Sequence, residues 1–387
     1  MAIFKELFKK MTPLNETEKV KLDGIQNLVT KQRFNLITSL LKDKKINIEF
    51  LELSPIIAQD FKLPNIIPLS DEIDTSEVNI DIKNKIMKDI FKDFSKKAYD
   101  IIPKLIAPNI KGMEYIKKAA ALQLFSKQAL HILLLGDPGT GKTDVLRSVF
   151  QFAPISSFGL GSGTSGVGLV ATIKGNKIMK GLLPLADKGI CCIDELNLMK
   201  EDSRAGLYNA MEKGFVNYDK GGHHHRFDAR SKILATANPK GDKFTGKTVE
   251  ELKSEMPFDS ALLTRFHLVF FIKKPDLKKF KEIAKKITSQ DKIKIKKGDI
   301  EIIKGYINHV MNIEMYDLSK EIQEQIVNFI TELKQNENNY LIEISPRQVI
   351  GIMRLCNAVA RINARDKVIM KDLDIVKDIF KNSLNLE

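Results

Sequence analysis

The sequence predicts an α/β protein with a parallel sheet flanked by helices, a C-terminal all-helical region and a small helical N-terminal region. Three observations support this fold class. An apolar strand, a glycine-rich loop and a helix follow one another between His131 and Phe150. Further short apolar runs alternate with helical segments up to residue 275, as in parallel sheets. From Pro275 onward, apolar residues recur at helical spacing.

The loop after the first strand reads GDPGTGKT and matches the phosphate-loop pattern G-x-x-x-x-G-K-[ST]. Its glycines allow main-chain N–H groups to turn inward around phosphates, and the next helix points its positive dipole end at the same anion. Lys142 is expected to reach the β- and γ-phosphates, and the Thr143 hydroxyl to take a Mg²⁺ position. We therefore expect the whole loop to bind ATP with Mg²⁺. It comprises Gly136, Asp137, Pro138, Gly139, Thr140, Gly141, Lys142 and Thr143.

The composition limits the class of protein. With 387 residues the chain is long enough for two or three domains. The net charge of +13 favours an anionic partner such as nucleic acid, although a general bias toward lysine would give the same excess. No apolar run reaches membrane-spanning length and the charged start MAIFKELFKKM is unlike a signal peptide, so we expect a cytoplasmic protein without a membrane partner. Cys191, Cys192 and Cys356 suggest neither a disulfide framework nor a zinc site.

We expect three parts: a helical N-terminal region over 1–105, an α/β core over 106–275 and a helical lid over 276–387. In the first part helices are expected over 19–41 and 78–102, with short helices and turns between them because three prolines interrupt that stretch. The lid helices are expected near 276–289, 298–312, 318–334, 345–364 and 371–383, with Asp317 and Ser345 as N-caps and Pro346 in the first turn.

Within the core, besides the helix over 144–150 after the phosphate loop and a short helix leading to Leu262, four buried strands, two helices, a hairpin and a polar loop are expected. The strands are 132–135, 189–195, 231–239 and 268–272, the helices 112–125 and 196–213, the hairpin 215–226 with Gly221 and Gly222 as its turn, and the loop 240–257. The glycine- and serine-rich stretch Ser156–Gly189 is expected to be weakly structured, either as a functional mobile segment or as a surface insertion.

Polar residues at strand ends suggest the chemistry of the site. Asp194 closes a buried strand, where a carboxylate could hold the Mg²⁺ shell, and Glu195 beside it could polarise an attacking water. Asn238 ends the next strand, where its amide could orient water or contact the γ-phosphate. Arg265 and Arg347 could each serve as an arginine finger for the transferred phosphoryl group. The alternatives are a charged strand end, a turn asparagine and surface arginines.

The triple histidine His223–His225 invites a metal interpretation. Consecutive histidines on a strand point in alternating directions, so a single tight site is not favoured. No set of Cys or carboxylate residues converges nearby in sequence. We expect instead a hairpin tip or flank that contacts an anion or solvent.

Taken together, the motifs from Ile106 to Leu384 resemble the MCM family of AAA+ proteins, the archaeal and eukaryotic replicative helicases. The resembling segments are IAPNIKGMEYIKKAAALQLF, GDPGTGKT, GSGTSGVGLVA, GICCIDELNLM, ATANP, LLTRF and SPRQVIGIMRLCNAVARINARDKV. They are similar to that family's first helix, its Walker A loop, the approach to its helix-2 insert, its Walker B box, its sensor 1, its arginine-finger box and its sensor 2 helix.

The resemblance implies a role for each matching residue. Lys142 and Thr143 would bind phosphate and Mg²⁺, Asp194 and Glu195 would form Walker B, and Asn238 would be sensor 1. Arg265 and Arg347 would reach the nucleotide of a neighbouring subunit, which implies a homo-oligomeric ring, by family analogy a hexamer. Lys220 matches the lysine of the family's pre-sensor-1 hairpin, which faces DNA in the central channel, and would bind phosphate without reading sequence. A full-length MCM protein is a further candidate partner.

The sequence also departs from the family pattern. Gly141 and Thr143 stand where the family usually has Ala and Ser, Leu196-Asn197-Leu198 replaces Phe-Asp-Lys, and His267 replaces the aspartate after Arg-Phe. Only about 105 residues precede the core and they hold no zinc ligands. The helix-2 insert looks shortened, and no winged helix follows the lid. We therefore expect a short, divergent, archaeal-type member without the OB-fold and zinc-binding N-terminal tier.

The sequence is consistent with three functions. The first is an ATP-dependent, ring-forming DNA-binding motor, an MCM-like helicase or translocase that hydrolyses ATP at subunit interfaces. The second is a protein-remodelling ATPase of the MoxR or chelatase type, which shares the phosphate loop, the sensors and a related hairpin. The third is a truncated regulatory paralogue that binds a full-length ring. Six intact candidate residues argue against an inactive site: Lys142, Asp194, Glu195, Asn238, Arg265 and Arg347.

Overall fold

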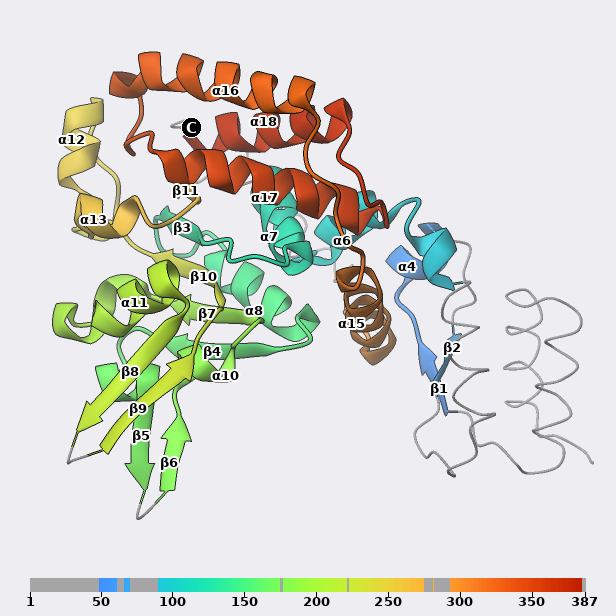
Figure 1. Cartoon of the computed structure of the whole chain (residues 1–387), viewed down its shortest axis with the longest axis horizontal. Coiled ribbons are helices and arrows are strands. Elements are labelled where there is room, and N and C mark those ends of the chain that lie inside the picture. The colour runs from blue at the N-terminus through green and yellow to red at the C-terminus, as the bar shows by residue number, and fades with distance from the viewer. Residues whose placement is uncertain are drawn as a thin grey trace, which may run out of the picture. The chain divides into compact units, whose positions relative to one another are not determined.

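The computed structural model describes residues 49–60, 66–69, 90–174, 177–220, 223–274, 281 and 293–384 (Figure 1). The chain forms two compact units, one from residues 1–101 and 293–303 and the other from residues 102–292 and 304–387. The predicted helix 19–41 lies outside the described residues, as do residues 78–89 of the next predicted helix and all of 276–289 except residue 281.

The first unit contains a two-stranded antiparallel sheet. Strand β1 (Glu49–Glu52) pairs with β2 (Ile66–Leu69), and helix α4 (Pro55–Asp60) lies between them in the chain. The prediction of helices and turns alone was wrong for these strands. Each strand of a two-stranded sheet has one free edge, so a proline within β2 costs no ladder hydrogen bond when its nitrogen faces that edge. Helix α6 (Ala98–Leu105) begins in this unit, and so does α15 (Lys297–Met311).

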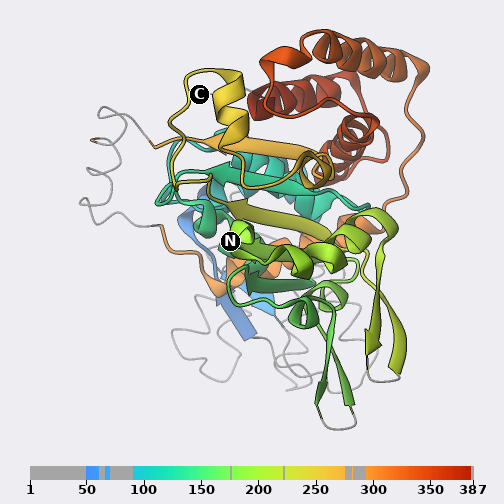
Figure 2. The same cartoon turned by 90° about the vertical axis from the view of Figure 1, so that its left-hand side faces the viewer.

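The second unit is built on a five-stranded parallel sheet (Figures 1 and 2). In sheet order the strands are β11 (Leu268–Ile272), β3 (Ile132–Gly136), β10 (Lys232–Ala237), β7 (Ile190–Asp194) and β4 (Ser156–Leu160). The four predicted strands are confirmed, and they are almost entirely buried. The edge strand β4 was not predicted, because its sequence SSFGL is not a continuous apolar run and only part of it is buried.

Helices lie between the strands in the chain, and some of them cover the sheet. They are α7 (Glu114–Phe125), α8 (Lys142–Phe152), α9 (Gly166–Val170), α10 (Leu182–Leu185), α11 (Ala205–Lys213), α12 (Val249–Ser254) and α13 (Ser260–Leu263). Helix α8 packs on β4, β7 and β10, and α7 packs against α8. The predicted parallel sheet flanked by helices is therefore confirmed.

Two β-hairpins extend side by side from the second unit, away from its C-terminal helices (Figures 1 and 2). One pairs β5 (Ala171–Lys174) with β6 (Lys177–Lys180), and the other pairs β8 (Phe215–Lys220) with β9 (His223–Asp228). The second confirms the predicted hairpin, although its turn lies outside the described residues. The first shows that the expectation of a weakly structured 156–189 segment was wrong for its described residues.

Two further boundaries differ from prediction. The predicted helix 196–213 begins only at Ala205, after two short 3₁₀ turns at Leu196–Leu198 and Glu201–Arg204. The predicted loop 240–257 contains α12, whose start is fixed by a capping box between Thr248 and Glu251.

The C-terminal region is helical, as predicted. It contains most of α15, then α16 (Lys320–Gln335), a 3₁₀ turn (Glu337–Asn339), α17 (Pro346–Ile362) and α18 (Met370–Leu384). Ser345 caps α17 in a capping box, with Pro346 as its first residue, and both predictions are confirmed. Ser319, and not Asp317, caps α16. Helices α17 and α18 pack on α7, and α18 also packs on β11. No helix among the described residues is long and apolar enough to cross a membrane.

Candidate active site

The phosphate loop links the end of β3 to the start of α8. Gly136 lies so close to β11 that a Cβ there would stand 2.1 Å from the carbonyl oxygen of Ile272. Gly139 and Gly141 adopt positive φ angles of 78° and 91°, which favour glycine. The side chain of Ile110 lies against Gly141, 3.0 Å from where a Cβ would be. The loop is therefore shaped by three positions that need glycine.

Lys142 is the first residue of α8, and its ammonium is held inside the loop. Nζ donates to the carbonyl oxygens of Gly136 and Asp137, both at 2.7 Å. Burial lowers the pKa of this ammonium to about 8, and the Asp137 carboxylate acts in the opposite direction. A phosphate in the loop would give the cation an anionic partner that these neutral carbonyls do not supply.

Asp194 closes β7 beside the start of α8. The Thr143 hydroxyl lies 3.2 Å from Asp194 Oδ1, so the two predicted Mg²⁺ ligands are adjacent. The carboxylate is 5% exposed, and the Thr236 hydroxyl donates to the same Oδ1 at 2.5 Å. A hydroxyl and a carboxylate next to a phosphate loop are the oxygen ligands that Mg²⁺ takes in nucleotide sites. The residues present therefore fit MgATP.

Glu195 and Asn238 follow two neighbouring strands at the same edge of the sheet, where the phosphate loop also begins. The Glu195 N–H donates to Thr236 Oγ1 at 2.9 Å, and Glu195 has a left-handed φ of 53°. The Asn238 N–H donates to the side-chain oxygen of Asn197 at 3.0 Å. Thr236 and Asn197 were missed at the sequence level, because only the pairing of β7 with β10 brings them to the site.

Both oxygens of the Asp137 carboxylate accept hydrogen bonds from the protein's own main chain. Its Oδ1 accepts the N–H of Phe244 and its Oδ2 accepts the N–H of Lys274, both at 3.0 Å. The side chain is 5% exposed. Although Asp137 was predicted among the nucleotide-binding residues, its carboxylate joins the phosphate loop to the loop before α12 and to the segment after β11.

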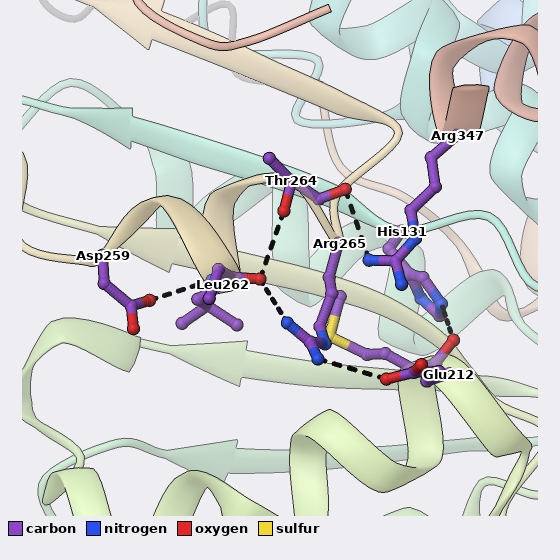
Figure 3. Close-up of polar contacts among 9 residues, drawn as sticks. His131, Glu212, Asp259, Leu262, Thr264, Arg265 and Arg347 are labelled. Atoms are coloured by element: carbon purple, nitrogen blue, oxygen red, sulfur yellow. Dashed lines mark hydrogen bonds and ion pairs between the residues drawn. The ribbon is translucent and has the colours of Figure 1, made fainter. Parts of the chain in front are cut away.

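Arg265 and Arg347 lie close together (Figure 3). Arg265 follows α13, donates to the Ala261 carbonyl and pairs with Glu212 at 3.1 Å. Arg347 Nη1 lies 3.5 Å from the Thr264 carbonyl oxygen.

A main-chain hydrogen bond shows at which end of the parallel strands the two arginines lie. The His267 N–H donates to the carbonyl oxygen of His131, the residue before β3, at 2.9 Å. The phosphate loop begins at the other end of β3. At about 3.3 Å per residue, the strand alone separates the two ends by about 13 Å. Both arginines therefore lie at the opposite edge of the sheet from their own phosphate loop.

Two buried histidines form hydrogen bonds to the main chain at the edge of the sheet where the arginines lie. His131 Nδ1 accepts the N–H of Ile233 at 3.1 Å, and His267 Nδ1 accepts the N–H of His131 at 3.0 Å. Burial lowers the pKa of His131 to about 3 and also lowers that of His267. Both imidazoles are therefore neutral at ordinary pH and accept main-chain hydrogen bonds.

The hairpin β8–β9 presents Lys220 at the last position of β8, paired with His223. Further down the hairpin, His224 Nδ1 lies 2.9 Å from Asp219 Oδ1, and both side chains are more than half exposed. Arg226 stacks over the Phe215 ring at 3.7 Å. The hairpin therefore carries charged and aromatic groups from its base toward its tip.

Comparison with known proteins gives a consistent family result. Residues 83–291 match the MCM P-loop domain, and residues 301–384 match the MCM AAA-lid domain. The chain is 30% identical to DNA replication licensing factor MCM4 of Arabidopsis thaliana over 315 residues, 73% of this chain and 37% of that protein. It is 27% identical to Minichromosome maintenance protein MCM of Saccharolobus solfataricus over 336 residues, 78% of this chain and 49% of that protein. The chain thus spans less than half the length of these relatives.

Proposed function

The chain belongs to the MCM family, and from this premise we propose that it is an ATP-hydrolysing, DNA-binding motor that works as a ring of identical subunits. The observation that carries the proposal is the position of Arg265 and Arg347 at the edge of the sheet opposite the phosphate loop. An arginine contributes to phosphoryl transfer only when its guanidinium reaches the transferred group. In the proposed ring, each subunit supplies its two arginines to the nucleotide of the next subunit. The interface is head-to-tail, and closure of such interfaces gives a ring.

The residues at the loop edge of the sheet would carry out hydrolysis. Lys142 would bind the β- and γ-phosphates, and Glu195 would accept a proton from the attacking water while Asn238 orients that water. Thr143 and Asp194 would hold Mg²⁺, which supplies neutralisation of phosphate charge when bound. Each assignment rests on the position of the residue beside the loop or at the end of a neighbouring strand.

The two hairpins support DNA as the partner. They extend side by side from the ATPase unit, and the pre-sensor-1 hairpin carries Lys220 at the end of β8 (Figures 1 and 2). The sequence has a net charge of +13. Two relatives are named for DNA replication licensing and minichromosome maintenance. We propose that the hairpin binds the phosphate backbone of single-stranded DNA without reading its sequence.

An ATPase titration with and without single-stranded DNA, run beside the Glu195→Gln variant, tests the proposal. We expect wild-type turnover that DNA stimulates, and a loss of about 10²-fold or more in the variant, because the general base is removed. Turnover that survives Glu195→Gln would overturn the assignment of the base. Turnover that ignores DNA but rises with a protein partner would favour a protein-remodelling ATPase instead.

A further inference from the structure

We propose that Thr236 is a positioning residue whose single hydroxyl sets both the Walker B carboxylate and the general base. This inference rests on the proposed ATPase function and adds a residue to its site. Thr236 lies on β10, is 1% exposed and is two residues before Asn238. It is therefore buried in the strand that ends in sensor 1, next to β7, the strand that ends in Walker B.

The Thr236 hydroxyl makes two hydrogen bonds that need opposite roles of its oxygen. Oγ1 donates its proton to Asp194 Oδ1 at 2.5 Å, and it accepts the N–H of Glu195 at 2.9 Å. A hydroxyl has one donor and can accept as well, so both contacts are satisfied at once. One side chain on β10 thus fixes two consecutive residues at the end of β7.

The first hydrogen bond orients the metal-binding carboxylate. Asp194 Oδ1 receives two hydroxyl groups, Thr236 Oγ1 and Thr143 Oγ1, at 2.5 and 3.2 Å. A short hydrogen bond from a hydroxyl to a carboxylate is strong, so the 2.5 Å contact with Thr236 contributes most to the orientation of this carboxylate. In that orientation the Asp194 carboxylate would hold the Mg²⁺ shell.

The second hydrogen bond holds the main chain of Glu195 in an unfavourable conformation. Glu195 has a φ of 53°, in the left-handed region that residues other than glycine rarely adopt. Such a conformation persists only when its surroundings determine it. Because the Glu195 N–H bonds to Thr236 Oγ1, this threonine directs where the side chain of the general base begins.

Asn197 makes the reverse connection between the same two strand ends. Its side-chain oxygen, after β7, accepts the N–H of Asn238, after β10, at 3.0 Å. The Arg204 guanidinium in turn donates to the Asn197 carbonyl at 3.4 Å. A side chain of β10 thus bonds to the end of β7, and a side chain after β7 bonds to the main chain after β10. These hydrogen bonds hold Walker B and sensor 1 together, and Thr236 makes two of them.

The direct test compares Thr236→Val, which removes the hydroxyl and keeps the shape, with Thr236→Ser, which keeps the hydroxyl. Hydrogen–deuterium exchange of the nucleotide-free full chain measures the Glu195 amide. We expect exchange in Thr236→Val to be roughly tenfold faster than in wild type, and exchange in Thr236→Ser to stay close to wild type. Thr331→Val is the matched control, because that exposed hydroxyl on α16 bonds only the Val327 carbonyl among the described contacts.

Steady-state ATPase kinetics give the second readout. We expect Thr236→Val to lower kcat by about 10- to 100-fold, with KM for ATP changed less than about threefold, and Thr236→Ser to restore most of the rate. Wild-type kcat in Thr236→Val, or Ser and Val variants that behave alike in both assays, would overturn the inference. If Glu195→Gln leaves turnover unchanged, the proposed function fails instead, and the exchange experiment still decides the role of Thr236.

Discussion

Arg347 Nη1 lies 3.5 Å from the main-chain oxygen of Thr264, the residue before Arg265. The contact begins a longer interface on one face of α17. Four residues after Arg347, a Cβ on Gly351 would stand 3.0 Å from His267 Cβ, and three residues further on Arg354 Nη1 lies 3.1 Å from His267 Nε2. The lid helix that carries one arginine is therefore packed on the segment that carries the other.

The first prediction concerns Arg347. In Arg347→Ala we expect kcat for ATP to fall by about 10²-fold or more, because the proposed neighbouring active site loses a guanidinium. The thermal midpoint should change little, since the one long hydrogen bond to Thr264 contributes weakly. Arg365→Ala is the control within the lid, because Arg365 pairs with the buried Asp372 and should lower the midpoint while kcat is retained. Unchanged kcat in Arg347→Ala at saturating ATP would exclude this role.

The second prediction concerns Asp137, whose two carboxylate oxygens accept two main-chain N–H groups. In Asp137→Asn an amide NH₂ must face one of these donors, so we expect a loss of about 1–3 kcal/mol in the free energy of unfolding. Denaturant titration measures it. Asp144→Asn, on the exposed first turn of α8, is the matched control and should change the value by less than about 1 kcal/mol. Equal losses of unfolding free energy in the two variants would contradict a stabilising role of the two hydrogen bonds to the Asp137 carboxylate.

The third prediction is a pH dependence of stability caused by His131. Its folded-state pKa, about 3, lies below its ordinary value of 6.5. Between these values the unfolded chain binds a proton that the folded chain does not, so stability is full above pH 6.5 and falls with acid. Each such histidine contributes a slope of up to about 1.4 kcal/mol per pH unit.

Denaturant titrations between pH 6 and 4.5 measure that slope. We expect it to be shallower by roughly 1 kcal/mol per pH unit in His131→Gln than in wild type. If the slope of His131→Gln equals the wild-type slope, the prediction is wrong, because His131 then contributes nothing to the pH dependence of stability.

The fourth prediction concerns the pre-sensor-1 hairpin. Lys220→Ala should weaken binding of single-stranded DNA, and the slope of log K against log salt should fall by about 0.7 for each lost phosphate contact. Lys127→Ala, an exposed lysine in the loop before β3, is the charge-matched control. If the two variants lose affinity and salt dependence equally, the effect is general charge, and the hairpin assignment fails.

Most of the parallel sheet could be predicted, because β3, β7 and β10 are buried along their whole length and each contains a run of apolar residues. The edge strand β4 could not. It pairs with β7 on one side only, so main-chain hydrogen bonds place a sequence with little apolar signal. Helix α12 also could not be predicted from apolar residues, because it lies with its capping box inside a polar stretch that has no clear apolar period.

In the candidate site, too, some residues could be predicted from the sequence and others could not. The phosphate loop and the Walker B pair follow from local motifs whose spacing is fixed by chemistry. Thr236 and Asn197 could not be found, because their partners lie 41 or 42 residues away in sequence and only the strand order makes them neighbours. The edge to which Arg265 belongs likewise depends on the bond between His267 and His131.

A mixing experiment tests most directly whether ATP is split between two copies of the chain. Lys142→Ala lacks the phosphate-loop cation and Arg265→Ala lacks the proposed finger, so each variant alone should be nearly inactive. In a co-assembled equimolar mixture, an interface with the loop of one variant and the arginine of the other is intact. We expect ATPase activity to return to about a quarter of the wild-type value, the share of intact interfaces under random mixing. Full activity of Arg265→Ala by itself, or no recovery in a mixture whose co-assembly is shown by pull-down of a tagged copy, would contradict a shared site.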